Sequence, residues 1–268
     1  MADNSNNTIW VFLSHSHHDY EKVRKVRNLL ETEGFRPLMF FLKCLEKEKY
    51  NELTKTLIKE EIDSRQRFIL CQSNNAKESD WVKFEANHIK EKHRPYEVVN
   101  LDWPDSKIEK ALRTFKERST VFLSYPWRLV DLARATDEEL KLWDYRTYFD
   151  KEDMFNGVIY ENFIHKQIAR AANDGYVLVF IDDIFNKESF QYREIVYAME
   201  SLNYKEGGRI IPVWAFQESS LFSFMQKNPD IYNTIGRYQG IDVSGMDFHK
   251  ASKEIAKQLN DIDICNNQ

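Results

Sequence analysis

The sequence is poor in glycine, proline and cysteine. Its 268 residues include 8 glycines and 6 prolines, too few for a collagen-like or linker-rich chain. No Gly-rich motif of the G-x-G-x-x-G or G-x-x-x-x-G-K-[ST] type occurs, so a dehydrogenase or a P-loop enzyme has no motif support. The three cysteines, Cys44, Cys71 and Cys265, show no pairing pattern. A disulfide scaffold is therefore disfavoured, and we expect a reducing cytoplasm.

Long apolar runs and a basic excess are also missing. The longest apolar runs, such as YVLVFI at 176–181, have the length of a strand and are too short to cross a bilayer. The polar segment MADNSNNT at 1–8 lacks the apolar stretch of a signal peptide. The formal net charge is −5, which gives no support for a nucleic-acid partner. We expect a soluble cytoplasmic protein with neither a membrane nor a nucleic-acid partner.

An internal repeat is the strongest pattern that the chain does contain. VFLSHS at 11–16 returns as VFLSYP at 121–126, and Lys-Glu-Ser at 77–79 returns at 187–189. Both offsets are 110 residues (121 − 11 and 187 − 77). Separate blocks that share one register indicate a tandem duplication.

The two copies are expected to form domains over 1–117 and 118–268. Each copy alternates strand-type apolar runs with helical periodicity, which predicts βαβ units and a parallel sheet covered by helices. In the first copy, strands are predicted at 9–14, 36–42, 67–72 and 96–103, and helices at 21–34, 51–62, 79–92 and 105–117. The second copy adds a strand–helix unit around runs at 209–216 and 238–244, and its last helix is expected to end at Leu259. The predicted fold class is α/β, with two parallel-sheet domains in tandem, the first shortened by about one βα unit.

A recurring carboxylate marks the expected ligand-binding edge, because open parallel sheets bind ligands beyond the carboxyl ends of their strands. After the third strand of each copy, an aromatic residue and a glutamate lie four positions apart on a helix: Trp81 with Glu85, and Phe190 with Glu194. A carboxylate that recurs on an otherwise apolar helix face indicates a functional site. The alternative is a helix-edge glutamate whose stem packs beside the ring while its head stays in water.

The segment SHSHHD after the first strand offers a metal-site alternative. His15, His17 and Asp19 match part of the H-x-H-x-D-H motif of metallo-β-lactamase-like hydrolases, but Tyr20 stands where the next ligand should be. The second copy has no histidine in the equivalent segment. We therefore predict no metal site, and we interpret the segment as a polar loop in which Ser16 or Asp19 caps the following helix.

Together, the two motifs resemble those of the TIR (Toll/interleukin-1 receptor) domain family. The first strand of that family typically reads F-[IL]-S-[HY]-S-x-x-D, here FLSHSHHD at 12–19. Its third strand leads through S-x-W into a helix that carries a glutamate, here SDWVKFE at 79–85. In the second copy the first motif is reduced to FLSYP at 122–126, and Phe190 replaces the tryptophan.

The resemblance implies a fold, an activity and a set of residues. The fold is a flavodoxin-like sheet of order 2-1-3-4-5, and the activity is cleavage of NAD+ with the helix glutamate as the catalytic residue. The catalytic residues carried over are Glu85 and Glu194. The residues carried over as NAD+ contacts are Ser14, His15, Ser16, Asp19 and Trp81 in the first copy, and Ser124, Tyr125 and Phe190 in the second. NAD+ is then a substrate, and no further cofactor is expected.

The chemistry of this reaction suits so small a set of residues. Nicotinamide leaves NAD+ as a neutral group, so no general acid is required, and one carboxylate can stabilise the oxocarbenium-like ribosyl centre. We expect an NAD+ nucleosidase or an ADP-ribose cyclase of a microbial antiviral defence or signalling system. Two alternatives stay open. One is a non-catalytic TIR assembly or adaptor protein, and the other is a nucleoside 2-deoxyribosyltransferase-like enzyme with the glutamate as nucleophile.

The resemblance also implies partners, and the two copies differ in what they offer. A homo-oligomer or TIR–TIR assembly is expected, and a nucleotide product would act on a downstream effector protein. The loop after the second strand is family-like in the second copy (DKEDMFNG, 150–157), whereas KCLEKEKY at 43–50 has no glycine. We therefore expect the first copy to supply Glu85 and the second to supply the loop or the contact surface. The alternative is plain divergence after duplication, with one copy only stabilising the other.

Overall fold

The computed structural model describes residues 9–40, 51–149, 160–202, 209–216, 221–236 and 240–265. The two loops compared above, 43–50 and 150–157, lie outside the described residues. The chain divides into two compact units, Met1–Lys116 with Asn260–Gln268, and Glu117–Leu259. The last segment of the second copy therefore belongs to the first unit.

The first unit is built on a four-stranded parallel sheet. In chain order its strands are β1 (Trp10–Ser14), β2 (Arg36–Met39), β3 (Arg67–Gln72) and β4 (Tyr96–Asn100), and their order in the sheet is β2-β1-β3-β4. In β1, Phe12 pairs with Leu38 of β2 and Phe68 of β3. The two central strands are apolar almost throughout because helices cover both faces of a parallel sheet.

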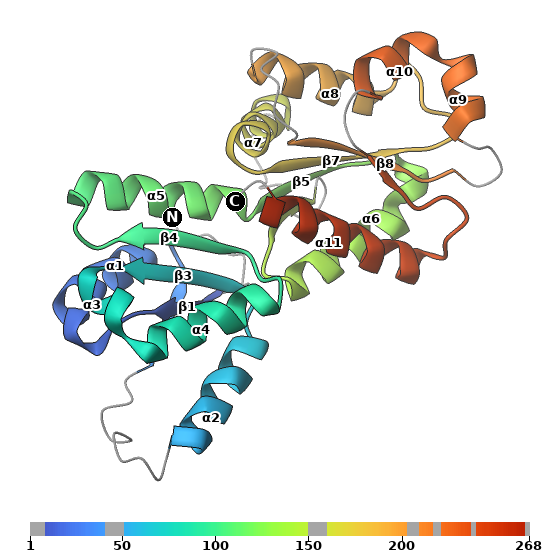
Figure 1. Ribbon diagram of the computed structural model, residues 1–268. Coiled ribbons are helices and arrows are strands. Elements are labelled where there is room, and N and C mark those ends of the chain that lie inside the picture. The colour runs from blue at the N-terminus through green and yellow to red at the C-terminus, as the bar shows by residue number, and fades with distance from the viewer. Residues whose placement is uncertain are drawn as a thin grey trace. The chain divides into compact units, whose positions relative to one another are not determined.

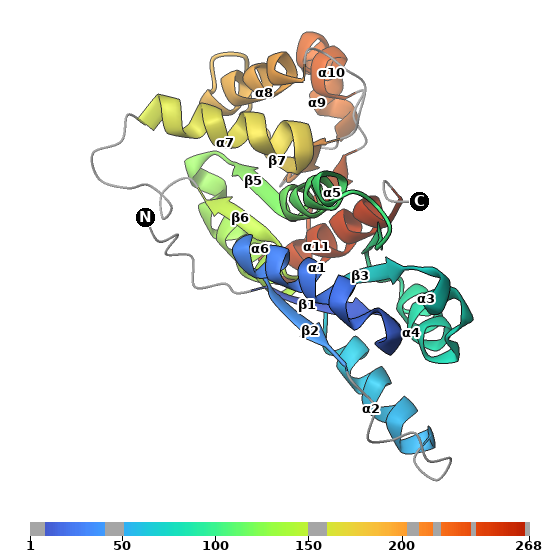
Figure 2. The same ribbon diagram turned by 90° about the vertical axis from the view of Figure 1, so that its left-hand side faces the viewer.

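Two layers of helices enclose this sheet (Figures 1 and 2). The helices of the first unit are α1 (Tyr20–Thr32), α2 (Asn51–Asp63), α3 (Asn74–Glu78), α4 (Asp80–Glu91) and α5 (Asp105–Arg118). On one face, α1 and α5 pack against Val11 and Leu13 of β1. On the other face, α2 and α4 pack against Phe12 and Phe68. Because side chains alternate along β1, its residues pack into two separate cores, one on each face of the sheet.

The second unit repeats this plan with one more strand. In chain order its strands are β5 (Thr120–Ser124), β6 (Arg146–Phe149), β7 (Tyr176–Ile181), β8 (Ile210–Trp214) and β9 (Ile241–Asp242), and their order in the sheet is β6-β5-β7-β8-β9. Every pairing is parallel. Counted within the unit, this order is the predicted 2-1-3-4-5. Within its described residues, the first unit has the same order without a fifth strand, which confirms the predicted shortening.

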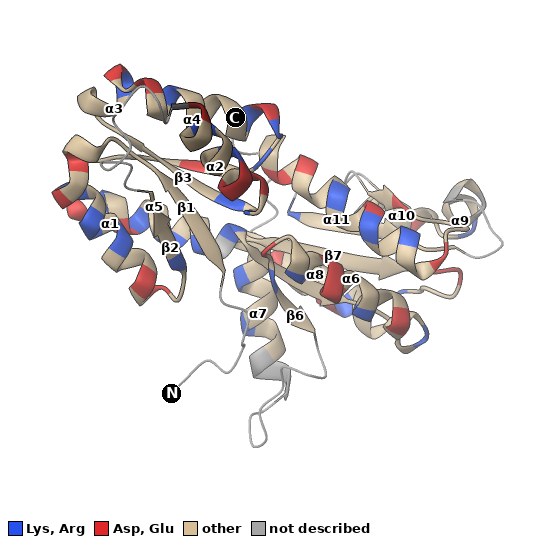
Figure 3. Ribbon diagram, turned by 90° about the horizontal axis from the view of Figure 1, so that it is seen from below, with Lys and Arg blue, Asp and Glu red and all other residues tan. Residues whose placement is uncertain are grey.

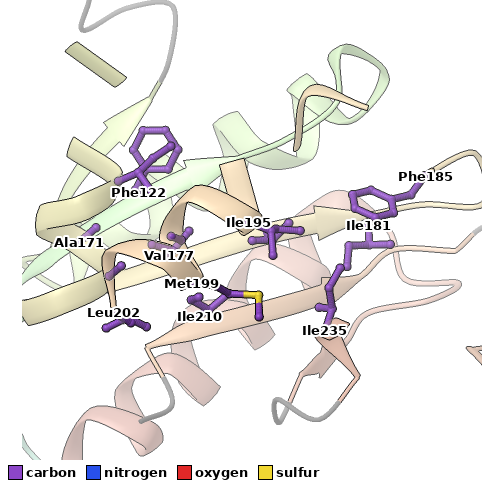
Figure 4. Packing of buried hydrophobic residues seen from close by; sticks show 14 of the residues in the cluster. Phe122, Ala171, Val177, Ile181, Phe185, Ile195, Met199, Leu202, Ile210 and Ile235 are labelled. Atoms are coloured by element: carbon purple, nitrogen blue, oxygen red, sulfur yellow. The ribbon is translucent and has the colours of Figure 1, made fainter. Parts of the chain in front are cut away.

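The helices of the second unit also form two layers (Figure 1). They are α6 (Val130–Leu142), α7 (Tyr160–Asp174), α8 (Phe190–Ser201), α9 (Leu221–Lys227), α10 (Pro229–Ile235) and α11 (Phe248–Cys265). Between the sheet and α7 and α8, Val177, Ile195, Met199 and Ile210 belong to one buried cluster (Figure 4). This packing fixes the face of α8 that turns toward the sheet.

The duplication is visible in the backbone as well as in the topology. Gly34 follows α1 with φ +84°, in the left-handed region that commonly terminates helices. Asp144, 110 residues on, follows α6 with φ +57°. Both copies therefore leave their first helix through the same left-handed turn.

The structure corrects the predicted helices in two places. The short helix α3 stands between β3 and α4, where the sequence predicted one helix from 79 onward. The last helix, α11, continues past the predicted end at Leu259 to Cys265. Its final turns are held in the first unit, where Asp263 pairs with Arg67 at 3.0 Å.

The surface carries both signs of charge. Lys and Arg alternate with Asp and Glu along the helices (Figure 3). Within the described ranges, no helix is long and apolar enough to cross a membrane.

Candidate functional site

Glu85 of α4 lies against the last residue of β1. Its Oε2 accepts a hydrogen bond of 2.6 Å from the Oγ of Ser14, and within the described residues Ser14 is its hydrogen-bond partner. The two residues are 5% and 0% exposed. Ser79 caps α4 through the backbone N–H of Val82, so the S-D-W spacing places Glu85 on the face that turns to the sheet. The alternative of a water-exposed helix-edge glutamate is therefore wrong.

This burial changes the charge of Glu85. Loss of water around the carboxyl raises its pKa to about 8, and the hydrogen bond from Ser14 opposes the shift. The carboxyl is therefore mostly protonated at neutral pH, and a cation placed beside it would favour its ionised form.

The second copy repeats the pair. Ser124, the last residue of β5, donates a hydrogen bond to Oε2 of Glu194 on α8. These two side chains are 1% and 6% exposed, and Ser189 caps α8 as Ser79 caps α4. The structure thus brings each predicted glutamate against the strand-end serine of its own copy.

Asp19 joins the segment after β1 to the segment after β3. Its Oδ2 accepts a hydrogen bond of 2.5 Å from Ser73 Oγ, and its Oδ1 accepts one of 2.8 Å from Asn75 Nδ2. Ser73 also caps α3 by accepting from the backbone N–H of Ala76 at 2.9 Å. The Asp19 side chain is 5% exposed, because these partners cover it.

The second copy joins the same two segments with different residues. The position equivalent to Asp19 is Leu129, which packs in the interior. Its neighbour Arg128 instead donates from Nε and Nη2 to the two carboxylate oxygens of Asp182, which follows β7, with Nη2 at 2.6 Å from Oδ1. A bidentate ion pair thus replaces the hydrogen bonds of the first copy.

His15 and Ser16 lie in the turn between β1 and α1. His15 is 8% exposed, and its Nδ1 lies 2.8 Å from the backbone oxygen of Leu13. Burial lowers the pKa of His15 and thereby favours the neutral ring. Ser16 is buried and caps the short 3-10 helix His17–Asp19 through the N–H of His18. Ser16 thus caps a helix as predicted, whereas the side chain of Asp19 makes no cap hydrogen bond to α1.

The aromatic residues carried over from the family differ in exposure. Trp81 is partly buried and stands edge-on to Phe84, with 6.4 Å between the ring centroids. Phe190 is 39% exposed. Tyr125 is buried and stacks on Phe149 at 4.9 Å, and its backbone oxygen accepts a hydrogen bond of 2.8 Å from Gln191. Phe190 is thus partly exposed with the Arg193 guanidinium 5.8 Å from its ring centroid, while Tyr125 is packed into its unit.

Metal binding and thiol chemistry are the two other possibilities that the side chains of this region raise. In the part of the chain that the structure describes, no group of three His, Cys, Asp or Glu side chains could hold a metal ion. Cys71 of β3 is buried, and burial together with the nearby charges of Asp19 and Glu85 raises the pKa of its thiol to about 12. A thiol with so high a pKa is not an activated nucleophile.

Sequence reasoning missed the residues that join the two segments. Ser73 and Asn75 belong to SNNAKE, which precedes the helix predicted from residue 79 and lies in no predicted element. A serine directly after a strand, followed by a helix-forming stretch, is the available signal for an N-cap. Arg128 and Asp182 carry no such signal, because their pairing depends on strands that are distant in sequence.

Comparisons with known proteins agree with the motifs. A family model described as TIR domain matches residues 11–117 and 121–259, one match for each copy. A protein of Cytobacillus dafuensis named "Putative cyclic ADP-D-ribose synthase TIR2" is 27% identical over 99 residues. That alignment covers 34% of this chain and only 25% of the relative's own length.

Among solved structures, the chain is weakly similar to the crystal structure of a variant of SsGBP. The sequence identity is 9% and the TM-score is 0.29, over 97% of this chain and 96% of the other. A likeness of this size carries no argument about fold or function.

Proposed function

The chain belongs to the TIR domain family, and on this premise we propose that it cleaves NAD+ at the bond between nicotinamide and ribose, with Glu85 as the catalytic carboxylate. The observation that carries the proposal is the burial of Glu85 at the carboxyl end of the first sheet with Ser14 on one of its two oxygens. That arrangement leaves Oε1 for a substrate hydroxyl.

The proposed step needs little from the protein beyond this carboxylate. The C1′–N1 bond breaks, and its electron pair neutralises the pyridinium nitrogen, so nicotinamide leaves without a proton. The positive charge passes to the ribosyl centre, which ionised Glu85 stabilises. Water then adds at C1′ and releases a proton, or a group of the same ADP-ribose adds and closes a ring.

The raised pKa of Glu85 fits a cationic substrate. In the free protein the buried carboxyl is mostly protonated at neutral pH, because its pKa is about 8. When the positively charged nicotinamide ring binds beside it, the attraction favours the carboxylate and the proton leaves. The catalytic charge thus forms when the substrate is present.

The relative from Cytobacillus dafuensis supports the same class of reaction through its name. Since this chain spans a quarter of that relative's length, the product stays part of the proposal. We propose ADP-ribose or a cyclic isomer as the product and a role in microbial antiviral defence or signalling. We further propose that assembly with other TIR domains accompanies activity.

Incubation of the purified protein with NAD+ tests the proposal. Nicotinamide should appear in the same amount as NAD+ disappears, and chromatography should resolve ADP-ribose or a cyclic isomer as the second product. The assay should be repeated at several protein concentrations, because an assembly would make the specific activity rise with concentration. Unchanged NAD+ at the highest concentration would reject the proposal.

A further inference from the structure

The segment from Ser14 to Asp19 is fixed at both ends. At one end, Ser14 donates to Glu85 at 2.6 Å. At the other, Asp19 accepts from Ser73 at 2.5 Å and from Asn75 at 2.8 Å. Between them, the backbone N–H of Asp19 donates to the backbone oxygen of Ser16 at 3.0 Å and closes a tight turn. A displacement at Asp19 would therefore be transmitted over five residues to Ser14.

The hydrogen bonds of Ser73 give this contact a direction. Its oxygen accepts from the N–H of Ala76, so its single hydrogen is available for Asp19. Asn75 adds a second donor to the other oxygen of Asp19. Asp19 is therefore an acceptor on both oxygens, and its side chain is 5% exposed. With one donor on each oxygen and so little exposed surface, this carboxylate is poorly accessible to a ligand.

We infer that Asp19 is a positioning residue, which holds the Ser14–Asp19 segment on α3 so that Ser14 stays on Glu85. This inference rests on the proposed function for its kinetic consequence. It gives Asp19 a different role from the NAD+ contact that the family resemblance implies.

The second copy supports the need for a connection at this place. There, the side chain of Leu129 has no hydrogen-bond acceptor, and Arg128 and Asp182 link the same two segments through an ion pair. The two copies therefore join the ends of their first and third strands by different chemistry, and each also has the serine–glutamate pair.

Four variants test the inference in the full-length chain. Asp19→Ala should lower kcat for NAD+ cleavage about tenfold, the usual effect of losing a hydrogen bond to a charged group, and should leave KM within about twofold. Asn75→Ala should act in the same direction, by about threefold, from an exposed position where misfolding is not expected. The double variant should be no worse than Asp19→Ala, because both changes break one connection. Asp19→Asn should keep most of the activity, since its amide can still pair with Ser73 and with a turned Asn75 amide.

Asp102→Ala is the matched control, because Asp102 is exposed and pairs with Lys22 on the surface. It should leave kcat unchanged. A rise in KM alone in Asp19→Ala would overturn the inference in favour of direct NAD+ contact. An Asn variant as poor as the Ala variant, or additive effects of positions 19 and 75, would overturn it as well.

Hydrogen exchange separates this inference from the proposed function. Amide exchange over residues 14–18 should be faster in Asp19→Ala and Asn75→Ala than in the wild type or in Asp102→Ala. This result is expected even if the wild type cleaves no NAD+. Unchanged exchange in both variants would show that Asp19 does not hold the segment.

Discussion

The Oγ of Ser14 lies 2.6 Å from Oε2 of Glu85, and both side chains are removed from water. One hydrogen bond from a neutral hydroxyl compensates only part of the cost of burying a carboxylate. The carboxyl therefore keeps its proton up to a pKa of about 8. This single property has consequences for the pH dependence of both activity and stability.

Activity should rise with pH below 8. The reaction needs ionised Glu85, and in the free protein the fraction of this form rises with pH up to the pKa of about 8. The value of kcat/KM should therefore increase about tenfold per pH unit between pH 6 and 7 and level off above pH 8. His15 lies in the same segment, and burial shifts the pKa of its ring downward, away from that of Glu85. Initial rates at low NAD+ concentration in buffers from pH 6 to 9 measure the profile. A flat profile would contradict the assignment of Glu85.

Stability should change with pH in the opposite direction. The folded-state pKa of Glu85 is about 8 and the ordinary value is 4.5, so between these values the folded protein holds a proton that the unfolded chain releases. The stabilisation from this proton is complete below pH 4.5 and is lost as pH rises through 8. A neutral amide at position 85 does not titrate, so a glutamine there avoids this loss of stability at high pH. Glu85→Gln should therefore melt several degrees above the wild type at pH 9 and close to it at pH 5.

Glu91→Gln is the control for this comparison, because Glu91 is exposed on the same helix. Its melting temperature should follow that of the wild type at every pH. A melting temperature of Glu85→Gln below that of the wild type at pH 9 would show that the carboxylate is stabilised in the fold, which the burial argument does not allow.

The ion pair between Arg67 and Asp263 should be essential for the first unit. Its side chains are 3% and 1% exposed, and the pair lies 3.0 Å apart across 196 positions of sequence. Removing one partner leaves a buried charge, at a cost of about 3–5 kcal/mol. Asp263→Asn should lower the denaturation midpoint accordingly, whereas Asp261→Asn, exposed on the same helix, should not. Equal midpoints for the two variants would contradict this role.

The same pair bears on fragments of the chain. A fragment that ends near Arg118 lacks Asp263, so it should be poorly folded. Single-site variants of the full chain are therefore the appropriate test of how the copies divide the work.

Much of the fold could be predicted because the same strand and helix pattern occurs in both copies. The 110-residue register showed the duplication, the apolar runs within each copy predicted the strands, and β3 was predicted with its observed bounds. Glu85 and Glu194 could be found since they recur at the same helical spacing. The predicted break after residue 117 placed 260–268 in the second domain, whereas this segment belongs to the first unit. No local sequence pattern indicates that the end of α11 packs with the first copy.

The connections between segments could not be predicted in the same way. Asp19 stands out in the sequence as a motif residue, but its partners Ser73 and Asn75 are defined only when β1 and β3 become neighbours. The pKa of Glu85 is equally hidden, because it follows from burial against Ser14 rather than from nearby charges in the sequence.

The most direct test of the central claim is the rate of nicotinamide release from NAD+ by wild type, Glu85→Gln, Glu194→Gln and Glu91→Gln, measured side by side at pH 8. Glu85→Gln should stay folded and lose about 100-fold or more of the activity, as expected when the group that stabilises the transition-state charge is removed. Glu194→Gln should lose less, because the second copy has Pro126 and Phe190 where the first keeps the family motif, and Glu91→Gln should match the wild type. Equal rates for wild type and Glu85→Gln would contradict the claim that Glu85 is the catalytic carboxylate.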